Sequence, residues 1–426
     1  MPRRNLLLLI VVALLALACC LRVQKDPYLR VMANAINTIE RRSLEPIDDL
    51  RLFEGAMRGM LGQLDKDSIY IPAADLDAFT EDIERQFAGV GMEVALDPQT
   101  NQLTVRSPLA GSPAYEAGVL AGDRILKIDG TSTEKMSMSE AVALLRGPPG
   151  KAVTLSVLHV GEKEPVEITI VREIIRVNTV LGDTRNEDGS WNYFLAGRDR
   201  VGYVRITSFS ETTAGELERV LGQLTEQGMR GLVLDLRNDP GGWLAAAVDV
   251  CDQLISSGVI VTTRRRGGRI SETYRAGGQG PFTDFPLAAV VNQETASAAE
   301  IVAACLQDHD RAVIVGQRTY GKGTVQEMIE LRQGYGAMKL TTASYWRPSD
   351  KDIQRPRDAT ENDQWGVTPN KGYEVVLTDE EYVEWQLWRI RRDAFQQPGN
   401  GGDEKDAKPY VDRQRQRAVE YVEKRD

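Results

Sequence analysis

The chain has 426 residues, of which 42% are apolar and 27% charged, with 38 glycines and 18 prolines. This length predicts two or three domains, and the composition excludes a disordered, collagenous or multi-spanning membrane chain. A formal net charge of -10 argues against nucleic acid as a partner, because proteins that bind phosphate backbones usually present a basic surface. The two histidines and four cysteines lack the spacing of a zinc module, so we expect no metal and no cofactor.

The first 21 residues (1–21) have the pattern of an export signal or membrane anchor. Two arginines precede an uninterrupted apolar run from Leu6 to Leu21, which is shorter than the roughly 20 residues that cross a bilayer untilted. A cleaved signal, a signal lipidated at Cys19 and an uncleaved anchor all stay open. In each case we expect an exported protein, in the periplasm or on the extracytoplasmic face of the membrane. Cys251 and Cys305 could pair there, although two buried thiols are the simpler expectation.

The rest of the chain divides by its hydrophobic periodicity. Apolar residues recur at helical spacing over 26–86 and predict a helical N-terminal region. Short strands and glycine turns over 87–172 predict a small β-rich module. Strands alternate with helices over 178–394, as expected for a layered α/β core. The glycine-rich, charged segment 395–408 is typical of a linker and precedes a C-terminal helix at 409–426. The predicted fold class is therefore a multi-domain α/β protein.

The α/β region contains several well-defined elements. The pattern predicts strands at 201–206, 231–238, 287–291 and 312–316, and helices at 213–227, 244–257 and 298–306. The third of these strands leads through a turn into an alanine-rich helix, which puts Ser297 near the helix start, where backbone amides lack intrahelical partners. Most serines at such positions only cap the helix, so this serine alone does not indicate catalysis.

A candidate base lies 25 residues further on, in the glycine-flanked turn GKGTVQ. Lys322 follows a second apolar strand that we expect beside the first. A lysine serves as the base for a serine only when its neutral amine is available, and the flanking glycines permit the close packing that would turn it inward. Gln326 could hold the amine without adding a charge, whereas a flexible surface lysine is the ordinary interpretation. His159, in an apolar strand, and His309, in a polar turn, are unattractive alternatives.

A third segment, LVLDLRNDPGGWL, is an apolar strand that ends in a glycine turn. By itself this turn has no other predicted role. Glycine also lets a backbone amide approach a developing oxyanion closely, and such a donor contributes roughly 3 kcal/mol to the transition state. The amides of Gly241, Gly242 and Ala298 are therefore the candidates for an oxyanion hole.

Together these segments resemble the C-terminal processing peptidases, also called tail-specific proteases. The matching motifs are DLRNDPGG, ASAAEIVAACLQD and GKGTVQ, and the resemblance extends over nearly all of the chain after the leader. It implies a serine endopeptidase with a core of the crotonase or ClpP kind, which cleaves proteins or peptides near their C-termini. It assigns Ser297 as the nucleophile, Lys322 as the general base and Gln326 as the third residue.

The β-rich module resembles a PDZ domain in the segments FAGVGMEV and GSPAYEAGVLAGDRILKIDG. PDZ domains bind an extended peptide as an additional strand and hold its terminal carboxylate on backbone amides. The resemblance assigns these amides to Gly89, Val90 and Gly91, whereas the glycines alone would indicate only a β-turn. The expected partners are proteins or peptides with free, apolar C-termini, and a homo-oligomer stays open.

Two other functions stay open. A non-catalytic PDZ scaffold that binds peptides or acts as a chaperone would leave the α/β core without chemistry, although Ser297 and Lys322 weigh against it. Acyl-thioester chemistry of the crotonase type would suit the amides at the strand-to-helix turns, but an exported chain would not meet coenzyme A substrates. Labelling with a serine-reactive probe that is lost in Ser297→Ala would exclude the non-catalytic scaffold.

Overall fold

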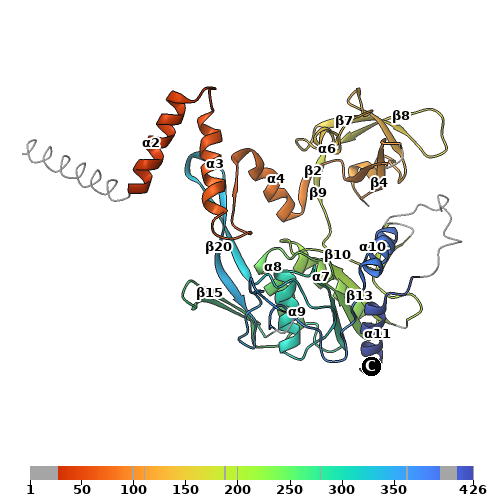
Figure 1. Ribbon diagram of the computed structural model, residues 1–426. Coiled ribbons are helices and arrows are strands. Elements are labelled where there is room, and N and C mark those ends of the chain that lie inside the picture. Colours follow the sequence, from red (N-terminus) through yellow and green to blue (C-terminus); the bar gives the residue numbers. More distant parts are fainter. Residues whose placement is uncertain are drawn as a thin grey trace, which may run out of the picture. The chain divides into compact units, whose positions relative to one another are not determined.

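A computed structural model describes residues 27–97, 100–109, 111–186, 189–198, 200–278, 280–360, 363–393 and 410–425 (Figure 1). The expected leader at 1–21 and the expected linker at 395–408 lie outside these residues. The chain divides into two compact units, one within 1–76 and 326–341 and the other within 77–325 and 342–426. No helix in the described part is long and apolar enough to span a bilayer.

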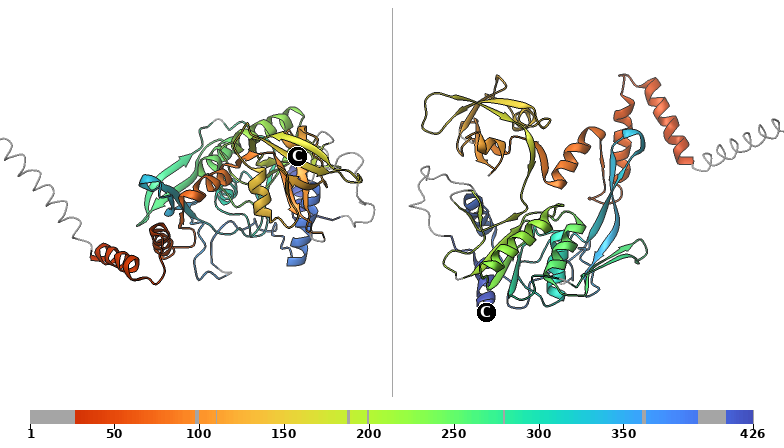
Figure 2. Two further views of the ribbon diagram at one scale, coloured as in Figure 1. Left: turned by 90° about the horizontal axis from the view of Figure 1, so that it is seen from above. Right: turned by 180° about the vertical axis from the view of Figure 1, so that it is seen from behind.

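The smaller unit contains the helices α2 (Pro27–Arg42) and α3 (Asp49–Leu61), which are separate rods in both views of Figure 2. Met57 and Leu61 of α3 form its core with Tyr70. Tyr70 lies on the strand β1 (Ile69–Ile71), which pairs with the first residues of β20 (Ala337–Trp346). The predicted helical region therefore includes a strand, because three residues are too few to register as a change of period.

The β-rich module has the strand order β3-β4-β5-β7-β8, with β6 beside β5, and a separate ribbon of β2 and β9. Its elements are β2 (Gln86–Gly89), β3 (Met92–Leu96), β4 (Leu103–Pro108), α5 (Pro113–Glu116), β5 (Arg124–Ile128), β6 (Thr131–Ser132), α6 (Met138–Leu145), β7 (Ala152–Leu158), β8 (Val166–Val171) and β9 (Glu173–Arg176), preceded by α4 (Ala73–Glu84). Ser137 and Glu140 form a capping box at the start of α6, which explains where this helix begins.

The central sheet of the larger unit has the order β10-β13-β14-β17-β18. Its strands are β10 (Val180–Leu181), β13 (Val201–Ile206), β14 (Gly231–Asp235), β17 (Leu287–Val291) and β18 (Val313–Gly316). β13, β14, β17 and β18 pair in parallel, whereas β10 is antiparallel to β13. Neighbouring parallel strands end at the same edge of a sheet. The segments that follow β14, β17 and β18 therefore leave the sheet side by side.

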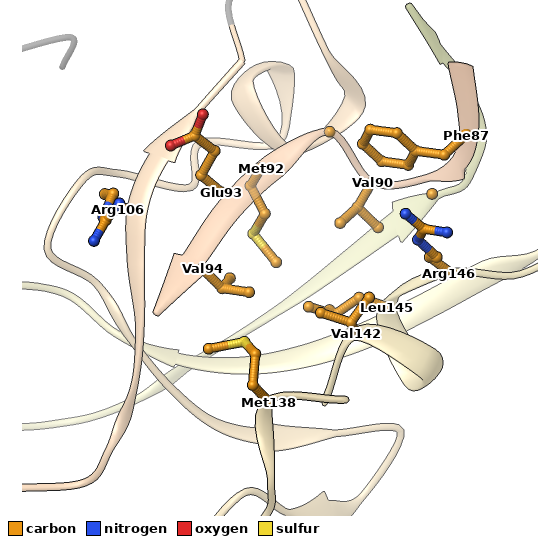
Figure 3. Close-up of a pocket in the computed structure, with 12 residues that line it drawn as sticks. Phe87, Val90, Met92, Glu93, Val94, Arg106, Met138, Val142, Leu145 and Arg146 are labelled. Atoms are coloured by element: carbon orange, nitrogen blue, oxygen red, sulfur yellow. The ribbon is translucent and has the colours of Figure 1, made fainter. Parts of the chain in front are cut away.

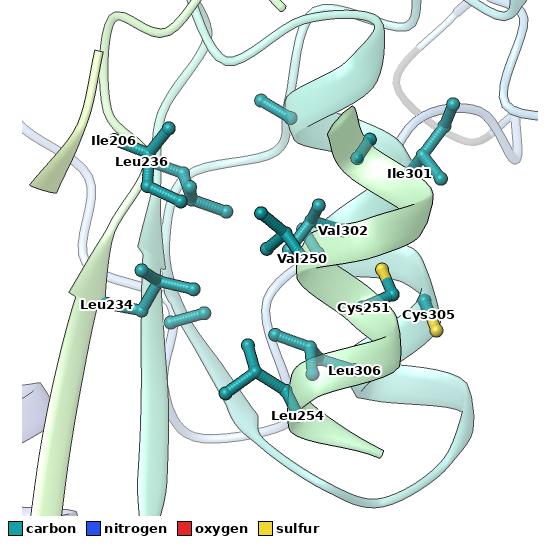
Figure 4. Close-up of a cluster of buried hydrophobic side chains, with 14 of the residues drawn as sticks. Ile206, Leu234, Leu236, Val250, Cys251, Leu254, Ile301, Val302, Cys305 and Leu306 are labelled. Atoms are coloured by element: carbon teal, nitrogen blue, oxygen red, sulfur yellow. The ribbon is translucent and has the colours of Figure 1, made fainter. Parts of the chain in front are cut away.

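Helices cover both faces of this sheet. On one face lie α7 (Thr213–Glu226), α8 (Leu244–Leu254) and α9 (Ala298–Asp308), and on the other lies α11 (Arg413–Arg425). Figure 4 shows Leu234 and Leu236 facing Val250 of α8 and Val302 of α9. Near-continuous apolar strands are typical of a parallel sheet buried on both faces. The remaining elements are β11 (Thr184–Arg185), β12 (Trp191–Asn192), β15 (Val259–Arg265), β16 (Arg269–Arg275), β19 (Thr324–Glu330), the 3-10 helix Arg332–Gly334 and α10 (Asp379–Asp393).

The structure confirms most of the predicted core elements, and two of these elements are shorter than predicted. β17 has the predicted bounds, and β18 lies beside it as expected. The helix predicted at 244–257 ends at Leu254, because Ile255 adopts an extended backbone. The strand predicted at 231–238 ends at Asp235, and Asn238 has a φ of 57° that no strand accommodates. Cys251 and Cys305 are free and buried, in agreement with the simpler expectation.

Candidate active site

Ser297 occupies a strained position between β17 and α9. It is the N-cap residue of α9, as the sequence predicts, with φ 55° and ψ -117°. A non-glycine residue in such a region costs of order 1–3 kcal/mol, and such residues cluster at active sites. The side chain lies at the sheet edge where β14 and β18 also end, and Ser297 is 9% exposed. The turn thus presents one serine at the carboxyl edge of the sheet.

Glu300, in the first turn of α9, joins this serine to the lysine segment. Its Oε2 accepts the amide of Ser297 at 2.9 Å and the amide of Lys322 at 2.7 Å. Its Oε1 accepts the amide of Gly321 at 2.7 Å and the hydroxyl of Thr319. The backbones of Ser297 and Lys322 therefore lie on either side of one oxygen atom. The structure brings the two expected residues together through a third that the sequence analysis missed.

The Glu300 carboxyl group is fully buried, and burial raises its pKa to about 7, although the four donors oppose this shift. The sequence carried one signal for it, the pattern Ser-x-x-Glu over 297–300, which is a capping-box signature. That signature predicts the bond to the Ser297 amide. It does not predict the bonds to Gly321 and Lys322, because these depend on the course of the chain after β18.

The segment around Lys322 is held by close backbone contacts. A Cβ added to Gly323 would come within 2.2 Å of the Gln354 amide nitrogen, so only glycine fits there. Before Lys322, the Tyr320 amide donates to the Thr295 carbonyl at 2.9 Å, which ties this segment to the turn that carries the nucleophile. Lys322 itself is half-buried. The flanking glycines therefore serve close packing, as the sequence predicts.

The glycine turn after β14 packs directly against the serine turn. A Cβ on Gly241 would lie 2.8 Å from the Ser297 Cβ and 2.7 Å from the Ala298 nitrogen. On its other side the turn is fixed by Phe209, whose amide donates to the Gly241 carbonyl at 3.0 Å and whose carbonyl accepts the Trp243 amide at 2.8 Å. Since amides alternate in direction along an extended segment, the Gly242 amide points away from Phe209.

Asp239 limits which amide of this turn is available. Its Oδ1 accepts the Gly241 amide at 2.8 Å, and its carbonyl accepts the Ala296 amide at 2.9 Å. The side chain is fully buried, and Oδ2 has no hydrogen-bond partner among the described residues. Burial raises the pKa of this carboxyl group well above its usual value. Of the three expected oxyanion donors, Gly241 is thus already bonded, and Gly242 and Ala298 are the better candidates.

Gln326 and the two histidines each have a hydrogen-bond partner of their own. Gln326 lies on β19, where its Nε2 donates to the Thr341 hydroxyl at 3.3 Å, so its predicted role beside the lysine stays a prediction. His309 ends α9, with Nε2 2.7 Å from the Val259 carbonyl. His159 follows β7, with Nδ1 2.9 Å from Asp123. Both histidines thus have structural partners, and neither lies at the serine turn.

The β-rich module contains a groove between β3 and α6, with a cavity of about 390 Å³. Figure 3 shows Met92 and Val94 of β3 facing Met138 and Val142 of α6 across this cavity. The residues expected to bind a carboxylate also line it, namely Gly89, Val90 and Gly91. Gly91 has φ 77°, and an added Cβ would lie 2.3 Å from the Ser112 Cβ. The groove therefore combines an apolar wall with a glycine turn at one end.

Two family models match the chain, peptidase family S41 over residues 200–370 and PDZ domain over residues 104–158. The chain is 42% identical over 273 residues to the carboxyl-terminal-processing protease of Synechocystis sp., with 63% of this chain and 61% of that protein covered. It is 37% identical over 351 residues to the carboxy-terminal-processing protease of Bartonella bacilliformis, with 78% and 75% covered. A solved structure, the photosystem II D1 C-terminal processing protease, is 28% identical with a TM-score of 0.44, covering 82% of this chain and 88% of that chain.

Proposed function

Because the chain belongs to the carboxyl-terminal-processing protease family, we propose that it is a serine endopeptidase that cleaves proteins or peptides near their C-termini. The resemblance drawn from the sequence motifs is confirmed by the family matches, as is the mixed α/β fold with a PDZ domain and a protease core. The observation that carries the proposed mechanism is the Glu300 carboxyl group. One of its oxygens accepts the amides of both Ser297 and Lys322.

In the proposed mechanism, the neutral amine of Lys322 takes the proton of the Ser297 hydroxyl while Oγ attacks the scissile carbonyl. The amides of Gly242 and Ala298 stabilise the resulting oxyanion. Ala298 is the first residue of α9, so no intrahelical bond uses its amide. The Lys322 ammonium then protonates the leaving amine. In the second half of the reaction, Lys322 takes a proton from the water that attacks the acyl-enzyme and returns it to Ser297 Oγ. Gln326 is proposed to hold the Lys322 amine by a neutral hydrogen bond.

Covalent labelling tests the nucleophile directly. We expect a fluorophosphonate probe to label the wild-type protein at Ser297, because the oxyanion donors and the base activate this hydroxyl group. Peptide mass mapping locates the label, and Ser297→Ala should abolish it. A wild-type protein that stays unlabelled under conditions where a control serine protease reacts would favour the non-catalytic PDZ scaffold.

We propose further that the PDZ groove binds the substrate's C-terminus. The apolar wall of Met92, Val94, Met138 and Val142 suits an apolar last side chain, and the glycine turn offers backbone amides to the carboxylate. Amidating the C-terminus of a protein substrate removes the charge that these amides would hold. Cleavage should then slow by about tenfold or more, chiefly through KM, at the same scissile bond.

A short peptide that contains the scissile bond but cannot reach the groove is the control for amidation. Its cleavage should not depend on whether its C-terminus is free. Equal rates for the amidated and free forms of the long substrate would remove the PDZ groove from substrate recognition. The localisation proposed for this enzyme is outside the cytoplasm, and it rests on the arginines and the apolar run of residues 1–21.

A further inference from the structure

Arg237 lies at the centre of a buried polar cluster that joins the segment after β14 to the C-terminal part of the chain. Its side chain is 0% exposed, and its two terminal nitrogens donate to the Asp412 carboxylate at 3.0 and 2.8 Å. The guanidinium also donates to Asp235 through Nε at 3.0 Å and to Gln414 Oε1 at 3.1 Å. Each N–H of the guanidinium has an acceptor, so the group is held in one orientation.

The ion pair between Arg237 and Asp412 is bidentate and buried, unlike the surface ion pairs of this protein. Asp412 itself is 3% exposed. A buried arginine that loses one of its carboxylate partners keeps its charge and loses part of the compensation for its desolvation, here leaving Asp235 as the remaining carboxylate. Without Asp412, Arg237 would therefore move toward other acceptors or toward water. The Arg237 amide and its Nε both donate to Asp235 Oδ1 at 3.0 Å, so a movement of the guanidinium changes a contact that it shares with the backbone of Arg237.

Arg237 is also the residue from which the glycine turn departs. After it, Asn238 has φ 57°, and its amide donates to Asn292 Oδ1 at 3.0 Å. The turn then reaches Gly241, which packs against Ser297 with no room for a side chain. Four residues separate Arg237 from Gly242. The Asp239 carbonyl accepts the Ala296 amide, and the Gly241 carbonyl accepts the Phe209 amide. We therefore expect a shift at Arg237 to reach the Gly242 amide.

We propose that Asp412 is a positioning residue for the oxyanion hole, acting through Arg237. The C-terminal segment would then complete the active site without touching the substrate. The inference rests on the proposed function, because it requires the Gly242 amide to face the tetrahedral intermediate. A displaced oxyanion donor weakens transition-state binding and leaves substrate binding nearly unchanged.

Asp412→Asn separates the positioning of Arg237 from the second role of Asp412, which is to cap the start of α11. The Asp412 carboxylate also accepts the Arg415 amide at 3.0 Å, at the start of α11. Asparagine caps helices as well as aspartate does, so the variant keeps the cap through Oδ1. It loses the negative charge, and its NH₂ group takes the place of the oxygen that accepts the second terminal nitrogen of Arg237. We expect kcat to fall by at least about tenfold, with KM changed by less than about threefold. The inhibition constant of a substrate-like peptide boronic acid should rise in parallel with the loss of kcat/KM.

The matched control is Arg413→Ala in the same segment. Arg413 is 51% exposed and pairs with Glu381 at the surface, so kcat should stay at the wild-type value. A second variant, Gln414→Met, removes one neutral acceptor from Arg237 and also the Gln414 donor to the Val375 carbonyl. It should lower kcat less than Asp412→Asn does, again at constant KM. If Asp412→Asn does not fold, Gln414→Met tests the positioning role in its place, by a lower kcat at unchanged KM.

Two results would overturn the inference. One is a folded Asp412→Asn variant with wild-type kcat and a lower melting temperature, which would make Asp412 a purely structural ion partner. The other is an equal change of KM and of boronic acid affinity, which would place the defect in substrate binding. Failure of the proposed function is a different outcome, because the wild-type protein itself would then lack fluorophosphonate labelling at Ser297.

Discussion

Replacing Ser297 or Lys322 by alanine is expected to reduce peptide-bond cleavage by at least about a thousandfold while the protein stays folded. The change at Ser297 removes one oxygen atom and keeps the amide that donates to Glu300. The change at Lys322 keeps its amide bond to the same carboxyl group. Because the two side chains act as one unit, the double variant should be no slower than either single variant. Initial rates on a substrate with a free apolar C-terminus measure this, and circular dichroism reports the fold.

His309→Ala is the control for the choice of base. His309 lies at the far end of α9 and hydrogen-bonds the Val259 carbonyl, so its loss affects stability and leaves turnover of the folded protein intact. Near wild-type turnover in Lys322→Ala together with an inactive His309→Ala would show that the base has been assigned to the wrong residue.

The residues that carry the proposed chemistry could be located from the sequence because each follows a short apolar run. Strands such as 287–291 are buried on both faces and contain little besides Val, Ala and Leu, which makes their ends easy to read. Ser297 and Lys322 lie shortly beyond two such ends. The 25-residue spacing from Ser297 to Lys322 matches the spacing in the resembled family, which secondary-structure propensity alone would not reveal.

The residues that hold this chemistry in place could not be located in the same way. Glu300 has the sequence pattern of an ordinary capping box, and its bonds to the lysine segment exist only because β18 pairs with β17. Asp412 belongs to a polar C-terminal segment that reads as a solvated helix, yet it meets a guanidinium 175 residues earlier in the chain. Periodicity reports which face of an element is buried. It does not report which distant polar group the fold brings to that face.

Glu300→Gln is the second substitution with a large expected effect. Each carboxyl oxygen of Glu300 accepts at least one backbone amide, Gly321 at Oε1 and both Ser297 and Lys322 at Oε2. A glutamine NH₂ group at either position would face a donor and leave a buried amide unsatisfied, which costs about 1–3 kcal/mol. We therefore expect a less stable protein whose kcat falls by about a hundredfold, since the serine and lysine segments lose their common anchor. Glu294→Gln, three residues before Ser297 at an exposed site, is the matched control and should behave as wild type.

The pH dependence of stability separates this anchor from a general loss of packing. Burial raises the pKa of Glu300 from 4.5 to about 7, so the folded protein holds this proton more tightly than the unfolded chain does. The contribution of Glu300 to the free energy of unfolding is then greatest below about pH 4.5 and falls as the pH rises toward about 7. Glu300→Gln has no such proton, and its deficit in unfolding free energy relative to wild type should shrink over the same interval. Denaturant unfolding at several pH values measures this difference. A deficit that stays constant or grows with pH would mean that the Glu300 carboxyl group is ionised throughout, and that the two segments are anchored by a buried charge instead of a titrating acid.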